Sequence, residues 1–305
     1  MTDGMQGPSA CAGAGAGWTP ARIVAIDWSG ARGPRYRGIA VAMCGPDDDP
    51  PVLVQPPSGW WSRTAVHDWL ATLDDAFVGI DCAFSLPFAV AGRHLPAGAT
   101  VFDLWERIER VCAGEDDFGG GPFVTDPVFG PDFWTTGHRP DTYADPHRGT
   151  EWACRRDGLG EPQSPYKLIG AKQVGRGALA GMRMLRSLRG AAPGRVAVWP
   201  FDTPAAHTRM VLTEIYPRLF LMRAGFGRRK LRDGADLDAA LAQFGARPLG
   251  LTGPLDDHAT DALVSAAGMR RLLAAPGVWA PPALDGEARR REGWIFGVGL
   301  AGAIP

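Results

Sequence analysis

The sequence predicts an α/β fold, and three observations support this. Short apolar runs typical of buried strands recur along the chain, the first at residues 22–27. Between these runs lie segments whose apolar side chains recur at helical spacing, as at residues 62–73. The composition of the 305 residues, with 45% hydrophobic and 21% charged, is ordinary for a globular protein.

The expected elements alternate along the chain in an order that begins with three strands, a helix and a fourth strand. Ser62 is the expected N-cap of the first helix. Asp256 or Asp257 is expected to cap the last helix. The C-terminal stretch 291–305 is expected to form a last short strand or a docked tail. The expected elements are strands at 22–27, 36–44 and 51–55, a helix at 62–73, a strand at 76–82, helices at 101–112 and 166–189, strands at 195–201 and 210–216, and helices at 233–244 and 256–274.

We expect residues 21–305 to form a single domain preceded by a disordered tail at 1–20. The tail is rich in Gly and Ala. Residues 88–165 are rich in Gly, Pro, Asp, His and Trp, with a convincing helix only at 101–112. They are expected to be a long insertion that serves as a lid or an elaborated substrate loop.

The sequence predicts a cytoplasmic protein that has no membrane partner. The N-terminus lacks the basic start and apolar core of a secretory signal. No apolar run approaches the roughly 18 residues that would span a bilayer. The five cysteines are odd in number and widely spaced, which fits a reducing compartment.

The charge is unevenly distributed, although the formal net charge is only −1. Residues 176–232 hold 12 Arg and Lys against two acids, Asp202 and Glu214. Such a basic sector is suited to an anionic backbone. It is also explained by a compositional bias toward Arg, because only three of the 32 basic residues are Lys.

Acidic residues stand at the ends of separated strands and at the start of the last helix. Asp27 ends the first strand, Asp81 ends the fourth and Glu214 lies on a late strand. Asp257 and Asp261 are four residues apart and share a helix face. Converging carboxylates repel one another, and Mg²⁺ or Mn²⁺ relieves that repulsion through the oxygen ligands it prefers.

The same acids could instead have purely structural roles in turns and helix caps. Asp27 precedes Trp28-Ser29-Gly30, where it could accept hydrogen bonds from the Ser29 and Gly30 amides as a turn. Asp257 and Asp261 could cap the last helix and compensate its dipole.

Several stretches resemble known families. The strand and helix order, with acids after the first and fourth strands and on the last helix, resembles the ribonuclease H-like superfamily. The H-x-x-D-A-L of residues 258–263 looks like the closing helix of RuvC-type Holliday-junction resolvases. The chain is most similar, over residues 22–297, to the DUF429 family, which is described as predicted ribonuclease H-like nucleases. The stretches that carry this similarity are GIDCAFSLP at 79–87, VWPFD at 198–202, TEIYPRL at 213–219, DHATDALVSA at 257–266 and EGWIFG at 292–297.

The resemblance implies a three-layer fold with a mixed central sheet and a divalent-metal-dependent nuclease or phosphodiesterase. Asp27 would bridge two Mg²⁺ or Mn²⁺ ions, and His258 would orient a water or move a proton. Nucleic acid is the partner expected on this hypothesis, with phosphates held by Arg residues of the basic sector. The implied catalytic residues are Asp27, Asp81, Glu214, Asp261 and His258, the implied metal ligands are Asp27, Asp81, Glu214, Asp261 and Asp257, and the candidate substrate-binding residues are Ser29, Arg218 and Lys172.

Two other hypotheses belong to different classes. The same fold could bind a nucleotide or a small phosphorylated metabolite without cutting a polymer. The near-neutral charge favours this alternative, as do the aromatic residues of the insertion, which could cover a small ligand. Those residues are Phe123, Phe133, Trp134 and Trp152. The other hypothesis is a non-catalytic module that retains the fold.

Overall fold

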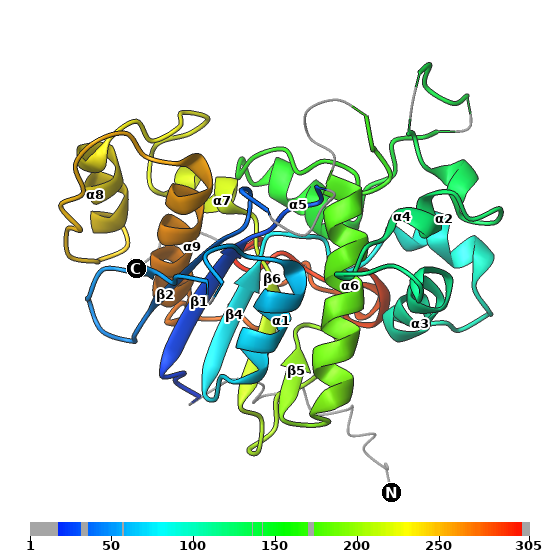
Figure 1. Ribbon diagram of the computed structural model, residues 1–305, viewed down its shortest axis with the longest axis horizontal. Coiled ribbons are helices and arrows are strands. Elements are labelled where there is room, and N and C mark those ends of the chain that lie inside the picture. Colours follow the sequence, from blue (N-terminus) through cyan, green and yellow to red (C-terminus); the bar gives the residue numbers. More distant parts are fainter. Residues whose placement is uncertain are drawn as a thin grey trace, which may run out of the picture.

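The computed structural model describes residues 18–31, 36–56, 58–135, 137–141, 143–169 and 174–300. A mixed sheet with strand order β3-β2-β1-β4-β6-β5 lies at the centre (Figure 1). β2 is antiparallel to both β1 and β3, whereas β1, β4, β6 and β5 run parallel to one another. The strands are β1 Arg22–Asp27, β2 Ala40–Cys44, β3 Val52–Leu53, β4 Ala76–Ile80, β5 Val196–Val198 and β6 Met210–Glu214.

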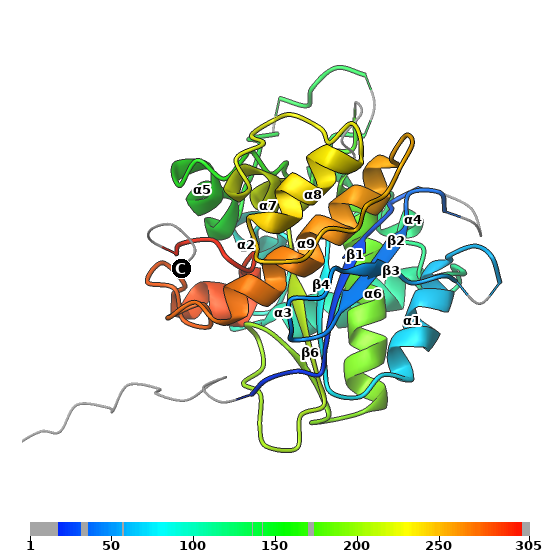
Figure 2. The ribbon, with the colours of Figure 1, turned by 90° about the vertical axis from the view of Figure 1, so that its left-hand side faces the viewer.

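Helices cover both faces of the sheet, as Figures 1 and 2 show. α1 and α6 lie on one side, and α7, α8 and α9 lie on the other. The α/β fold with a mixed sheet is therefore confirmed. The helices are α1 Arg63–Ala71, α2 Phe88–Ala91, α3 Val101–Cys112, α4 Gly121–Val124, α5 Gly149–Arg156, α6 Val174–Ala191, α7 Pro217–Arg223, α8 Gly234–Ala242 and α9 Asp257–Leu273, with shorter turns η1 Gly92–His94, η2 Gly130–Asp132 and η3 Ala288–Glu292.

Successive side chains of each strand point to opposite faces of the sheet, so the buried side chains form two hydrophobic cores. Val24 and Ile26 of β1 face the core beneath α1, α3 and α6. Ile23 and Ala25 face the core beneath α7, α8 and α9. Because successive side chains point to opposite faces, Asp27 at the end of β1 points toward the α9 side.

Two helices, α1 and α9, begin at capping residues that the sequence predicted. The Ser62 side chain accepts a hydrogen bond from the Ala65 amide at the start of α1. Asp256 accepts from the His258 and Ala259 amides and so caps α9. Asp256, and not Asp257, is thus the cap, which leaves the Asp257 and Asp261 side chains to other contacts.

The insertion holds a helix, α5, that the sequence did not predict. Two further differences from the expectation have a local cause. The helix expected over 166–189 is described over Val174–Ala191, and the backbone of Tyr166 and Leu168 bonds to Trp134 instead of continuing a helix. The helix α7 follows directly after the strand expected at 210–216 and was not predicted by the sequence. A proline at the first helical position needs no amide partner and suits a helix start.

The insertion packs onto the rest of the chain. α3 is confirmed, and its Val101, Leu104 and Ile108 join the core beneath α6. Phe123 and Phe133, which the alternative hypothesis offered to a ligand, are buried in the same core, whereas the Trp152 side chain is 54% exposed. The insertion therefore contributes to both cores, since Ala153 and Cys154 of α5 lie in the core beneath α7, α8 and α9.

The described part of the C-terminal stretch docks on β6 through a β-bridge. Ile295 pairs with Glu214 in parallel, and the Phe296 amide donates to the Glu214 carbonyl over 2.9 Å. The tail therefore reaches the carboxyl end of β6.

Candidate functional site

Three of the predicted acids meet at the carboxyl edge of the sheet. Asp27 ends β1, and Asp81 follows β4 with its amide donating to the Ile26 carbonyl over 2.9 Å. The two carboxyl groups lie within hydrogen-bonding reach of each other. Asp261 is carried to the same place by α9, which packs across β1 and β2. Asp27, Asp81 and Asp261 are called the carboxylate cluster below.

The cluster holds carboxylates in surroundings that disfavour their charge. Burial and the neighbouring carboxylates hold the pKa of Asp81 well above its usual range. Burial and the charge of Asp27 raise the pKa of Asp261 to about 7. Burial also raises the pKa of Asp27, against the opposing effect of His258. A cation bound here would relieve this destabilisation.

His258 is bonded to the centre of the cluster. Its Nδ1 lies 2.6 Å from Oδ2 of Asp27, and its side chain is 46% exposed. The hydrogen bond to Asp27 raises the pKa of the imidazole. The ring thus joins a buried carboxylate to a solvent-accessible face, which suits proton transfer at Nε2.

Gly38 and Ser29 border the exposed edge of that ring. A Cβ placed on Gly38 would stand 3.4 Å from Nε2 of His258 and 3.4 Å from Oγ of Ser29. Ser29 Oγ accepts a hydrogen bond from the Ala31 amide over 3.2 Å. The sequence predicted Gly38 to lie within the strand at 36–44, whereas β2 begins at Ala40, and the place of Gly38 beside His258 was missed.

Glu214 is not brought into the cluster. It pairs in register with Ile80, whose side chain faces the α6 side, so Glu214 leaves the sheet on the face opposite Asp27. Its Oε1 lies 2.6 Å and its Oε2 2.8 Å from the guanidinium of Arg148. The carboxylate is therefore held in a buried ion pair, although its charge still raises the pKa of Asp81.

The remaining predicted residues lie around the cluster or outside the described chain. Asp257 forms an ion pair with Lys230 at the first turn of α9. Arg218, in the first turn of α7, lies near enough to Asp261 to oppose the rise in its pKa. Its Nη1 donates to the Gly227 and Arg229 carbonyls over 3.2 Å. Lys172 lies outside the described residues.

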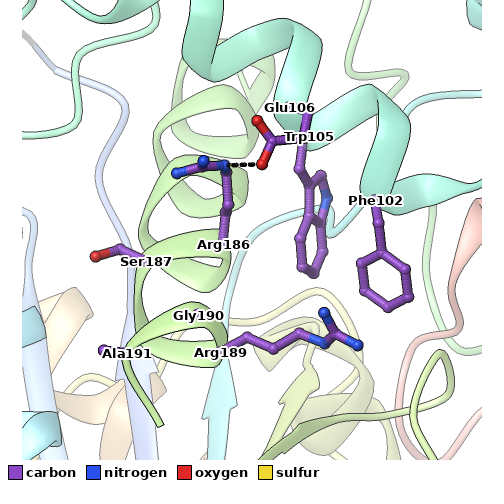
Figure 3. A pocket seen from close by; sticks show the side chains of 8 residues that line it. All are labelled: Phe102, Trp105, Glu106, Arg186, Ser187, Arg189, Gly190 and Ala191. Carbon is purple, nitrogen blue, oxygen red and sulfur yellow. Dashed lines mark hydrogen bonds and ion pairs between the residues drawn. The ribbon is translucent and has the colours of Figure 1, made fainter. Parts of the chain in front are cut away.

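Arginines on α6 serve helix packing. A cavity of about 520 Å³ lies between α3 and α6 (Figure 3). There Arg186 bonds Glu106 over 2.7 Å, while Arg189 stacks on Phe102 at 3.8 Å and pairs with Asp202. This part of the basic sector is thus neutralised, and the residues lining the cavity include none of the carboxylate cluster.

The donors of the cluster suit a hard divalent cation. Within the described residues, no group of three or more His, Cys, Asp or Glu side chains is arranged so that it could hold a metal ion. Mg²⁺, however, is usually bound by one or two carboxylates, with waters and substrate phosphates completing its shell. The paired carboxylates of Asp27 and Asp81, with Asp261 beside them, are donors of this kind.

Comparisons of the chain with protein-family models, with curated proteins and with solved structures find no match in any of the three. Among the described residues, no helix has both the length and the apolar character needed to cross a membrane.

The raised pKa of Asp261 predicts an unusual dependence of stability on pH. Since the folded pKa is about 7 against an ordinary 3.8, the folded chain holds this proton more tightly than the unfolded chain. The resulting stabilisation is complete below about pH 4 and is lost as the pH rises toward 7. Asp261→Asn should therefore be more stable than wild type at pH 8 in chelator, by up to about 4 kcal/mol. Urea unfolding between pH 4 and pH 8 measures this.

Asp257→Asn is the matched control, because it removes an exposed acid from the same helix. Its effect should stay below about 1 kcal/mol at every pH. Equal pH slopes for Asp261→Asn and wild type would show that Asp261 is not buried among acids.

Proposed function

We propose that this protein is a divalent-metal-dependent phosphodiesterase of the nuclease type, built on a ribonuclease H-like fold. The observation that carries the proposal is the meeting of Asp27, Asp81 and Asp261 at one edge of the sheet, with raised pKa values. Three elements far apart in the chain bring these acids together at a position where a cation would be stabilising.

The order of the elements supports the fold assignment. Three antiparallel strands, a helix and a parallel fourth strand are followed by a closing helix, α9, which carries the last acid. This is the order on which the resemblance to the ribonuclease H-like superfamily rests, whereas the similarity to DUF429 rests on the stretches at 79–87, 198–202, 213–219, 257–266 and 292–297. The proposed acids occupy the same places in that order.

Each residue has a proposed role that follows from its position. Asp27, Asp81 and Asp261 would hold Mg²⁺ or Mn²⁺. When bound, such an ion lowers the pKa of a coordinated water and stabilises the charge that develops on the phosphate. His258, fixed at Nδ1 by Asp27, would give or take a proton at Nε2. Arg218, beside Asp261, would bind a phosphate oxygen.

Hydrolysis with defined phosphodiesters tests the proposal. The substrates are DNA, RNA, branched DNA and bis(p-nitrophenyl) phosphate, each with Mg²⁺ or Mn²⁺ and with EDTA. We expect cleavage of at least one substrate, and we expect EDTA to abolish it. No cleavage of any of them with either ion would contradict the proposal.

A second candidate function is supported by a cavity beside the turn that follows β1. This cavity, of about 470 Å³, is lined by Gly30, Tyr36, Arg63 and Arg176 among others. Its volume lies within the range of small-molecule sites. The Arg63 guanidinium donates to the carbonyls of Ser29, Ala31 and Asp117, and Arg176 is the arginine offered to a phosphate group. On this alternative the protein binds a nucleotide or a phosphorylated metabolite without hydrolysis. Thermal stabilisation by a nucleotide, without turnover, would favour it.

A further inference from the structure

A loop rich in basic residues joins α7 to α8 at the carboxyl edge of the sheet (Figure 1). Residues 226–232 of this loop read FGRRKLR and contain no acid. They are called the basic loop below. They hold four of the 12 basic residues of the sector at 176–232, and all four are exposed: Arg228, Arg229, Lys230 and Arg232.

Arg218 holds the basic loop beside the carboxylate cluster. Its Nη1 donates to the carbonyls of Gly227 and Arg229, each over 3.2 Å. The same guanidinium lies near enough to Asp261 for its charge to oppose the rise in the pKa of that carboxyl. One side chain therefore contacts the backbone of the loop and faces an acid of the cluster.

The basic loop also bridges α9 and the insertion through exposed ion pairs. Lys230 pairs with Asp257 in the first turn of α9, where the two side chains are 51% and 46% exposed. Arg228 pairs with Glu161 of the insertion, and these side chains are 80% and 61% exposed. Exposed pairs contribute little to stability, so phosphate groups can replace these two carboxylates at little cost.

Other charged groups of the basic sector and of α8 are used within the fold. On α6, Arg183, Arg186 and Arg189 each pair with an acid. Asp233 and Asp236, which follow the basic loop, accept hydrogen bonds from backbone amides at the start of α8. The basic loop, in contrast, presents its charge to solvent beside the cluster.

This position suits a substrate that carries many phosphates in a row. A polynucleotide has a phosphate at every nucleotide. When one phosphodiester lies at the carboxylate cluster, its neighbours extend along the strand away from it. A small phosphodiester has no such neighbours and would make no use of the loop.

We infer that the basic loop binds the phosphate backbone of a nucleic-acid strand beside the bond to be cleaved, so that the substrate is a polynucleotide. This rests on the proposed function. It assigns Arg228 and Lys230 to phosphates that flank the bond, whereas Arg218 stays at the bond itself. Contacts of this kind position a strand and carry no base specificity.

The test is the binding of fluorescein-labelled oligonucleotides to the full chain in EDTA, measured by fluorescence anisotropy over a range of salt concentrations. Single-stranded DNA, duplex DNA and RNA form three arms. We expect at least one of them to bind, with an affinity that falls as the salt concentration rises. Arg228→Gln/Lys230→Gln should weaken that binding by at least about tenfold and lower the slope of log affinity against log salt by about 1.5 to 2.

Arg195→Gln/Arg247→Gln is the matched control. Arg195 pairs with Asp74, and Arg247 pairs with Asp48 and Asp49, in exposed ion pairs. The control therefore removes the same two charges, but from the opposite edge of the sheet, since Arg195 precedes β5 and Asp48 follows the end of β2. Its Kd should stay within about twofold of the wild-type value. All the replaced side chains are exposed, so both variants should fold like the wild type.

Equal weakening in the two double variants would overturn the inference, because net charge and not the basic loop would then account for binding. Unchanged binding in Arg228→Gln/Lys230→Gln, or no binding of any arm by the wild type, would also overturn it. Metal-dependent cleavage by the wild type would leave the proposed function standing in each of these cases. Binding that depends on the loop, without cleavage of any substrate, would support the loop as a phosphate site and contradict the proposed function.

Discussion

Replacing Asp27 with Asn is expected to lower metal-dependent phosphodiester hydrolysis by at least about a thousandfold. Asp27 lies between the other participants, since it bonds His258 at 2.6 Å and reaches the carboxyl group of Asp81. The substitution keeps the shape of the side chain but removes the charge that would hold the cation and orient the imidazole. The measurement is kcat/KM with bis(p-nitrophenyl) phosphate and with any polynucleotide that the wild type cleaves.

The loss of activity should not reflect loss of folding. Burial raises the pKa of Asp27, so removing its charge should leave the free energy of unfolding at pH 8 unchanged or increased. Asp257→Asn, whose ion pair with Lys230 is outside the cluster, should keep activity within about twofold. Undiminished turnover in Asp27→Asn would exclude the cluster from the chemistry.

Replacing Arg148 with Met is expected to have the largest effect on stability, a loss of about 3–5 kcal/mol in the free energy of unfolding. The variant leaves two buried carboxylates, Glu151 and Glu214, without their cation. It also removes the donor to the Glu292 carbonyl. A domain is stable by only about 5–15 kcal/mol, so a large fraction of the total would be lost. Guanidinium unfolding at pH 7 measures the change.

Arg186→Met provides the comparison for this variant. Arg186 also pairs with an acid, Glu106, but both side chains are largely exposed, at 38% and 55%. Its loss should cost less than about 1 kcal/mol. Equal losses in the two variants would show that the Arg148 ion pairs are no stronger than a surface pair.

The carboxylate cluster could be predicted because the ends of the strands can be recognised from the sequence pattern. Asp27 and Asp81 directly follow apolar runs, and parallel strands bring their carboxyl ends to the same edge. Asp261 could be placed because it lies three residues after His258 on a helix with small apolar residues. The contact between His258 and Asp27 could not be predicted from the sequence, because the two residues are 231 positions apart.

Glu214 shows where reading the sequence reaches its limit. The end of the strand that holds Glu214 was predicted. The face of the sheet from which its side chain projects depends on the strand register, and a shift of one residue would place it on the other face. Its partner Arg148 lies in the insertion, whose sequence has no regular apolar spacing. The sequence therefore contained no indication that Arg148 and Glu214 are in contact. The start of α7 was missed for a related reason, because a proline both ends strands and begins helices.

The most direct test of the carboxylate cluster is a crystal structure of the Mn²⁺-soaked protein with anomalous scattering. We predict an anomalous peak in contact with the carboxylate oxygens of Asp27 and Asp81 and beside Asp261, with Glu214 still paired with Arg148. A map without a peak at these carboxylates, or with its peak at another group of acids, would contradict the assignment.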